Sequence, residues 1–174
     1  MDHNHQHTSA VNIPPLKPKR RDYIPLLIIL GIIVLATGAV ALQTGFTYMH
    51  VLSYLMGFFF LIFGMFKLLD ITNFAMGYRE YDLIAKRIPA WGYLYPFIEI
   101  ALGAAYLAGL NMLWLNIVTL VLSALICLGV SIKLSKHEII QCVCLGNILK
   151  VPLTYVSLIE YAFMGSMAFV MLFI

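Results

Sequence analysis

The chain has 174 residues, of which 62% are hydrophobic and only 11% are charged, and its formal net charge is +3 at pH 7. Soluble domains usually carry about 25% charged residues, so this composition argues against a soluble protein and indicates an all-α integral membrane protein. The few basic residues are accounted for by the membrane, and we expect no nucleic-acid partner.

Residues 1–22 are predicted to form a disordered, basic tail on the cytoplasmic side. His3, His5 and His7 alternate with other residues in this tail. Neutral imidazole is a good ligand for zinc, copper and nickel, so the three histidines are candidate metal ligands. The alternative is a solvated tail without a metal. The apolar run that follows is too long for the core of a cleaved signal peptide, which has about 7–15 residues.

The rest of the chain, residues 23–174, is predicted to be one transmembrane domain with five spans. Lipid offers no hydrogen-bond partners to the backbone, so apolar segments of about 20 residues are expected to be helices. Polar residues or charges separate the segments from one another. The expected spans are about 23–42, 50–70, 90–109, 112–132 and 152–174.

The basic residues orient these spans, because cytoplasmic loops are enriched in lysine and arginine. With exactly five spans, all eleven basic residues fall on one side. We therefore predict a multi-pass protein of the bacterial inner membrane, with a cytoplasmic N-terminus and a periplasmic C-terminus. The basic residues lie before the first span (Lys17, Lys19, Arg20, Arg21), around the second connection (Lys67, Arg79, Lys86, Arg87) and around the fourth (Lys133, Lys136, Lys150).

The second connection, residues 71–88, mixes apolar and charged side chains. Such a mixture is typical of an amphipathic helix that lies in the membrane interface. Pro89 is expected to end this helix, and Trp91, Tyr93 and Tyr95 are expected to anchor the third span at the interface.

Cys142 and Cys144 form a C-x-C pair between the fourth and fifth spans. Two thiolates at this spacing can hold a soft ion such as Cu(I), and the same pair can exchange electrons as a dithiol. Two small residues that pack a loop are the structural alternative. The predicted topology places the pair in the reducing cytoplasm, where a lasting structural disulfide is not expected.

Four charged residues are expected within or beside the spans: Lys67, Asp70, Glu99 and Glu160. Isolated charges are costly inside a bilayer, so such residues usually face the bundle and pair with one another. Lys67 is expected to reach one of the two glutamates. The pattern fits a proton or cation relay as well as it fits a structural ion pair or a neutral carboxylic acid.

The last span carries three methionines in line with Glu160: Met164, Met167 and Met171. Their intervals place them on one helical face. Thioethers bind Cu(I), so this face is a candidate route for a soft ion, although methionine is also a common packing residue.

Three segments of the chain resemble the MauE/DoxX-like family of small bacterial membrane proteins, some of which are described as heavy-metal transporters. These segments are residues 64–70, residues 81–99 and residues 142–146, and together they frame about residues 50–174. The resemblance implies a four-helix bundle, to which the first span is an addition. It also implies a redox-associated role, with quinone or thiol chemistry and a disulfide-rich periplasmic partner. The predicted cytoplasmic position of the cysteines departs from that role.

The sequence leads us to expect a protein that binds or helps to transport a soft metal ion, with Cu(I) favoured, rather than an enzyme. Cys142 and Cys144 are the expected docking site, and Glu99, Glu160 and the three methionines are the expected route. The alternative is a membrane redox protein in which the two cysteines exchange electrons with a quinone or a thiol partner. Five spans make a small channel, so we expect a homo-oligomer or a complex with a metal-transport or redox partner.

Overall fold

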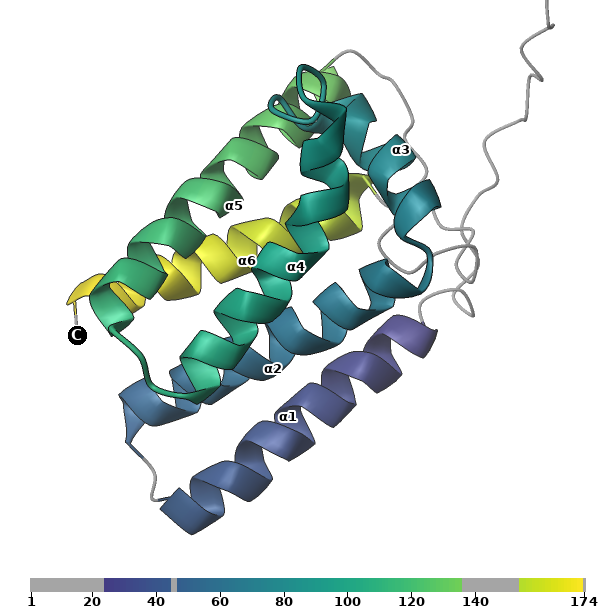
Figure 1. The fold of residues 1–174 in the computed structure, drawn as a ribbon. Helices are drawn as coiled ribbons and strands as arrows, with labels where there is room; N and C mark the ends of the chain where they lie inside the picture. Colours follow the sequence, from purple (N-terminus) through teal and green to yellow (C-terminus); the bar gives the residue numbers. More distant parts are fainter. Residues whose placement is uncertain (1–23, 45–46, 136–153, 174) are drawn as a thin grey trace, which may run out of the picture.

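A computed structural model describes residues 24–44, 47–135 and 154–173, and the described chain is helical (Figure 1). The described helices agree with the predicted spans to within about three residues at each end, with one short helix, α3, in the second connection. They are α1 (Ile24–Thr44), α2 (Tyr48–Leu69), α3 (Ile71–Tyr81), α4 (Pro89–Leu107), α5 (Met112–Ser135) and α6 (Thr154–Phe173).

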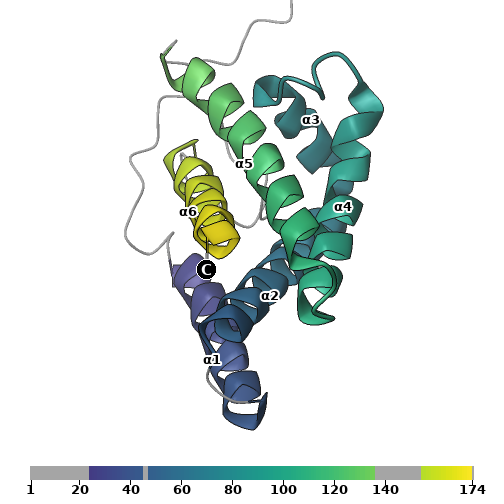
Figure 2. The same cartoon turned by 90° about the vertical axis from the view of Figure 1, so that its left-hand side faces the viewer.

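Two closely packed helix pairs form the bundle, α2 with α4 and α5 with α6 (Figure 2). Helix α1 packs mainly against α2, along one stripe in which Ile29, Ile33, Thr37 and Ala41 are buried at intervals of four residues. Most other side chains of α1 are apolar and partly or largely exposed, which a soluble bundle would not tolerate. A helix with one buried stripe and an otherwise apolar surface is expected at the edge of a bundle in lipid.

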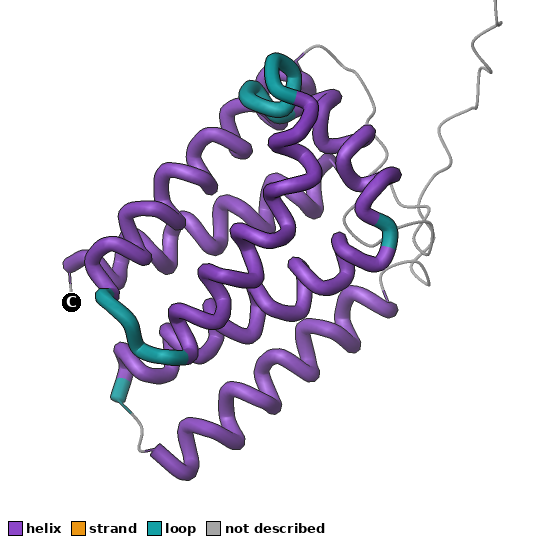
Figure 3. Tube along the Cα trace, viewed as in Figure 1, coloured by secondary structure: helices purple, strands orange, loops and turns teal. Residues whose placement is uncertain are grey.

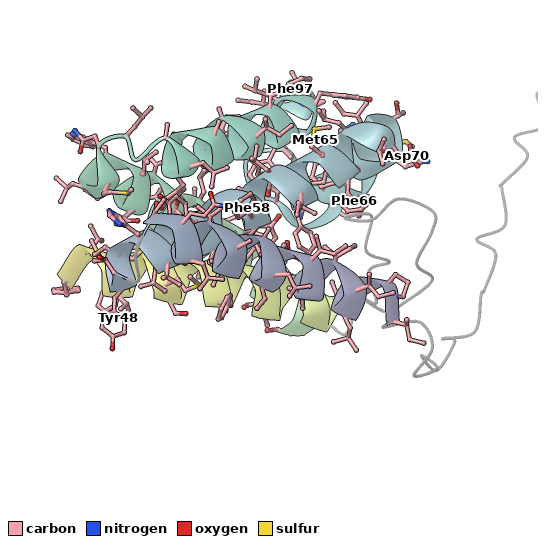
Figure 4. All side chains as sticks on the ribbon, turned by 90° about the horizontal axis from the view of Figure 1, so that it is seen from below. Tyr48, Phe58, Met65, Phe66, Asp70 and Phe97 are labelled. Carbon is pink, nitrogen blue, oxygen red and sulfur yellow. The ribbon has the colours of Figure 1, made fainter. Side chains whose placement is uncertain are left out.

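Apolar side chains also cover the outside of the other helices. Figure 4 shows Tyr48, Met65 and Phe97 on this outer surface, and more than half of each side chain is exposed. Three described helices are long and apolar enough to cross a membrane by themselves: α1, α2 and residues 112–132 of α5. The protein is therefore a multi-pass membrane protein, while the count of five spans remains a prediction for α4 and α6.

The ends of the helices alternate between the two ends of the bundle (Figure 3). The end of α2, the start of α4, the end of α5 and the start of α6 lie at the end where α3 lies, and the C-terminus lies at the opposite end. This arrangement is the one that the distribution of basic residues requires, although the side of the membrane on which each end lies remains a prediction.

Glycines bring α2 and α4 into backbone contact. A Cβ atom added to Gly103 of α4 would lie 2.9 Å from the carbonyl oxygen of Gly57 and 2.9 Å from the backbone nitrogen of Leu61, both on α2. A Cβ atom at Gly64 would lie 2.8 Å from a side-chain carbon of Ile100. In lipid there is no hydrophobic driving force between apolar side chains. Helices therefore associate through close packing, which small residues permit.

Helix α3 has one buried and one exposed face. Phe74, Ala75 and Tyr78 are buried against the bundle, whereas Arg79 and Glu80 are exposed. The prediction that this helix continues until Pro89 ends it is wrong, because α3 ends at Tyr81 and Pro89 begins α4. Helix α3 packs mainly against α4. That its exposed face lies in the membrane interface remains a prediction.

Candidate functional site

A lysine and a glutamate form an ion pair inside the bundle. Lys67 lies in the last turn of α2 and Glu99 lies in the middle of α4. The Lys67 Nζ atom donates a hydrogen bond to Glu99 Oε1, and each residue is only 1% exposed. Removing two charges from water is costly, and it is compensated only when the pair is well aligned and further hydrogen bonds support it.

Tyr161 of α6 supplies that support. The Lys67 Nζ atom also donates to the Tyr161 hydroxyl oxygen at 3.0 Å, and the Tyr161 hydroxyl donates to Glu99 Oε1 at 3.5 Å. The three side chains therefore close a ring of hydrogen bonds across α2, α4 and α6. We call Lys67, Glu99 and Tyr161 the charged centre.

Aromatic rings from three helices surround the ammonium group of Lys67. The Nζ atom lies 5.5 Å from the ring centroid of Phe74, 5.3 Å from that of Tyr95 and 5.4 Å from that of Tyr161. Each ring presents electron density to the cation, and such contacts strengthen when water is excluded. The rings stabilise the charged lysine without adding a second anion.

Tyr78 extends this aromatic wall towards the end of the bundle. Its ring stacks on Tyr95 with centroids 4.8 Å apart and on Phe74 with centroids 5.2 Å apart. Burial, and then the negative charge of Asp82, raises the pKa of Tyr78 well above the usual value of 10.0. The phenol therefore keeps its proton at physiological pH and brings no charge near Lys67.

A second group of buried polar side chains lies near the other end of α2 and α4. The Tyr106 hydroxyl of α4 lies 2.8 Å from Asn116 Oδ1 and 3.0 Å from Thr119 Oγ1, both on α5. Ser53 of α2 donates to the Tyr106 carbonyl oxygen at 2.8 Å. These four residues contain no ionisable group other than the tyrosine phenol, and we call them the neutral centre.

A comparison with known protein families identifies the family of the chain. The family model described as "Methylamine utilisation protein MauE" matches residues 26–174. The chain belongs to the MauE family. Neither the curated proteins nor the solved structures contain a match to this chain.

The extent of the match changes one expectation. The resemblance was expected to cover about residues 50–174, with the first span as an addition, but the family region begins inside α1. Helix α1 is therefore part of what this MauE-family protein shares with its family. The signal was missed because α1 carries no motif, only an unbroken apolar run.

The four charged residues predicted within or beside the spans differ in their burial and in their contacts. The expected pairing of Lys67 with Glu99 is present. Glu160 is half-buried, and its neighbour Tyr161 contacts Lys67. Asp70 lies outside the charged centre, at the junction of α2 and α3, where it accepts a hydrogen bond from Asn73 Nδ2 at 2.8 Å.

The three methionines of α6 belong to the hydrophobic core. Met164, Met167 and Met171 are 1%, 7% and 3% exposed, which is sufficient to explain them as packing residues. No cluster of metal-binding histidine, cysteine, aspartate or glutamate occurs among the described residues. His3, His5, His7, Cys142 and Cys144 lie outside the described residues, so their role as metal ligands stays a prediction.

Sequence reasoning missed the aromatic members of the site. It predicted Tyr95 as an interface anchor, which is wrong because Tyr95 is 1% exposed and its ring faces Lys67 inside the bundle. Tyr95 is one helical turn before Glu99, so it lies on the same face of α4, and this spacing was a usable signal. Phe74 and Tyr161 come from distant parts of the chain, and only the packing of α3 and α6 onto α2 brings them to Lys67.

Proposed function

We propose that this MauE-family protein is a membrane dithiol–disulfide exchange protein, in which Cys142 and Cys144 carry the electrons and the charged centre exchanges the accompanying protons. The proposal takes up the redox alternative of the sequence analysis in place of metal transport. Family membership supports this choice, and packing in the hydrophobic core is enough to account for the α6 methionines without a metal.

One observation carries the proposal. Residues 136–153, which include both cysteines, join the end of α5 to the start of α6. Both of these helix ends lie at the end of the bundle where α2 ends, and Lys67 is in the last turn of α2 (Figure 1). The charged centre therefore lies in the half of the bundle nearer to the end at which the cysteine segment is attached.

The exchange balances without a further reactant. The dithiol of Cys142 and Cys144 attacks a disulfide of a partner protein through a mixed disulfide, and the second thiolate then releases the partner. The cysteines end as a disulfide and the partner ends as a dithiol. Two electrons and two protons are thus transferred from the cysteines to the partner. A quinone could accept the same two electrons and two protons and would become a quinol.

Lys67, Tyr161 and Glu99 are suited to the proton transfers. A thiol must lose its proton to become a nucleophile, and the leaving thiolate must gain one. The carboxylate can accept a proton, the ammonium or the phenol can donate one, and the ring returns to its starting charge once the proton has been passed on.

Trapping the mixed disulfide tests the function. We expect one of Cys142→Ser and Cys144→Ser to accumulate a covalent adduct in cells, seen as a band on non-reducing gels that disappears with reductant. Cys127→Ser is the matched control, because Cys127 lies within α5. The absence of an adduct in both variants, together with Cu(I) binding that is mostly lost when either cysteine is replaced, would instead support the metal-binding function.

The orientation needs its own test. A membrane-impermeant thiol reagent should miss Cys142 and Cys144 in intact cells and reach them after lysis, if the cysteines face the cytoplasm. Labelling in intact, sealed cells would move the exchange partner to the periplasm. A homo-oligomer or a stable partner complex remains part of the proposal and is read from the mass of the purified protein.

A further inference from the structure

The turn between α3 and α4 holds an acidic side chain inside and two basic side chains outside. Asp82 is 1% exposed, and its Oδ1 atom accepts hydrogen bonds from the backbone nitrogens of Ile84 at 2.9 Å and Ala85 at 2.6 Å. Ala85 is fully buried. The turn is thereby fixed with Asp82 and Ala85 towards the protein, so the residues between and after them face outwards.

These outward residues line an open hollow of about 630 Å³. Its walls are Leu83, Ile84, Lys86, Arg87 and Ile88. Lys86 and Arg87 are both exposed, and neither forms an ion pair within the part of the chain that the structure describes. The hollow therefore combines two adjacent positive charges with exposed apolar side chains, of which Leu83 is 40% and Ile88 is 54% exposed.

The hollow lies directly before the predicted third span, where we expect the chain to enter the membrane. Helix α4 begins at Pro89, directly after the turn, and its first turns carry Trp91 and the 41% exposed Tyr93. Tryptophan and tyrosine concentrate where lipid headgroups meet the hydrocarbon. Further along α4, Leu94 and Phe97 are exposed and apolar, as expected for a surface that contacts acyl chains.

We propose that this hollow is a binding site for the headgroup of an anionic phospholipid. The phosphate would lie between Lys86 and Arg87, and the acyl chains would follow Leu83, Ile88 and the exposed face of α4. Charge complementarity favours an anionic lipid over a zwitterionic one, and a guanidinium next to an ammonium suits phosphate oxygens. The cytoplasmic leaflet, towards which the basic loops are predicted to face, is the anionic one.

The test measures the full-length protein in nanodiscs of stated composition. Thermal unfolding is followed in phosphatidylcholine alone and with a fraction of phosphatidylglycerol, and retained lipid is counted by native mass spectrometry. We expect phosphatidylglycerol to stabilise the wild type and to be retained. The double variant Lys86→Gln/Arg87→Gln should lose most of that stabilisation, with about a fivefold loss of lipid affinity for each cation removed.

Two controls separate this site from general surface charge. Arg79→Gln removes an exposed cation of α3 outside the hollow and should keep the preference for phosphatidylglycerol. The charge-conserving variant Lys86→Arg/Arg87→Lys should keep most of it. Inorganic phosphate, added in place of phosphatidylglycerol, should give no stabilisation. It has no acyl chain that could contact the apolar walls of the hollow.

Three results would overturn the proposal. They are equal stability of the wild type in both lipid mixtures, unchanged phosphatidylglycerol binding in the double glutamine variant, and an equal loss in Arg79→Gln. Equal unfolding temperatures of all variants in phosphatidylcholine alone verify that the substitutions leave the fold intact. A stabilisation by inorganic phosphate as large as that by the lipid would identify a phosphate site instead.

Discussion

Helices α2 and α4 hold two buried polar centres, one near each end, and the two centres differ in kind. The charged centre joins Lys67, Glu99 and Tyr161 at the end where α3 lies. The neutral centre joins Tyr106 to Asn116 and Thr119 near the other end. Between them the backbones of α2 and α4 touch at Gly57 and Gly103.

The difference separates two reasons for burying polar groups. Hydroxyl and amide groups can tie helices together in lipid at modest cost, which accounts for the neutral centre as a structural device. An ion pair gives little net stability after its desolvation, because apolar residues of similar volume would often do as well. Under our proposal the charged centre serves chemistry rather than stability, and the rings of Phe74, Tyr95 and Tyr161 lie around its ammonium group.

The largest effect is expected when half of the ion pair is removed. Lys67→Met leaves the buried Glu99 carboxylate without its cation, and breaking a buried pair typically costs about 3–5 kcal/mol. The loss is measured as reduced stability to denaturant in detergent. Lys86→Met removes an exposed cation and serves as the control with little effect.

The double variant Lys67→Met/Glu99→Leu sharpens this prediction. It removes both charges together, so we expect it to regain much of the stability that the single variant loses. A double variant as unstable as Lys67→Met would show that the aromatic wall, rather than the pairing, determines the cost.

The glycine contact between the two centres is expected to give the next largest effect. Gly103→Ala places a methyl group 2.9 Å from backbone atoms of α2, which cannot move aside as a side chain would. Overpacking of this kind typically costs about 1–3 kcal/mol. Gly31→Ala in α1 is the matched control, because nothing lies within 4 Å of its added methyl group. Equal unfolding temperatures for the two variants would refute the close approach.

An effect no larger than that of the glycine contact is expected in the neutral centre. Tyr106→Phe removes the hydroxyl group that contacts Asn116 and Thr119, and an unsatisfied buried polar group costs about 1–3 kcal/mol. Thermal unfolding measures the loss. Because this centre is assigned a structural role, the thiol exchange of the folded protein should not change. A slower exchange at full folding would break the distinction between the centres.

The smallest effect on stability is expected for Tyr161→Phe. The ring remains beside Lys67, and only the hydroxyl that bridges Lys67 and Glu99 is lost, so a cost of about 1 kcal/mol is expected from one hydrogen bond. The exchange rate should fall more than the stability does. If both stay at the wild-type level, Tyr161 is only a packing residue.

The sequence was sufficient to predict the helices, because apolar length and the positions of charges report directly on membrane spans. It also predicted that Lys67 would find a buried glutamate, since an isolated charge is costly in lipid. It could not choose between Glu99 and Glu160, which depends on how α6 is rotated. It also could not place Phe74, whose helix packs against the bundle through contacts distant in sequence.

The rate at which the Cys142–Cys144 pair is reoxidised after a pulse of reductant tests the central claim most directly. The measurement follows the alkylation mass shift in sealed membranes, in wild type, Lys67→Met/Glu99→Leu and Tyr106→Phe. A positioned proton donor or acceptor typically contributes about 10²- to 10⁴-fold, so the folded double variant should be at least about a hundredfold slower. Tyr106→Phe should match the wild type. A double variant that is folded and exchanges at the wild-type rate would contradict the assignment of the charged centre to redox chemistry.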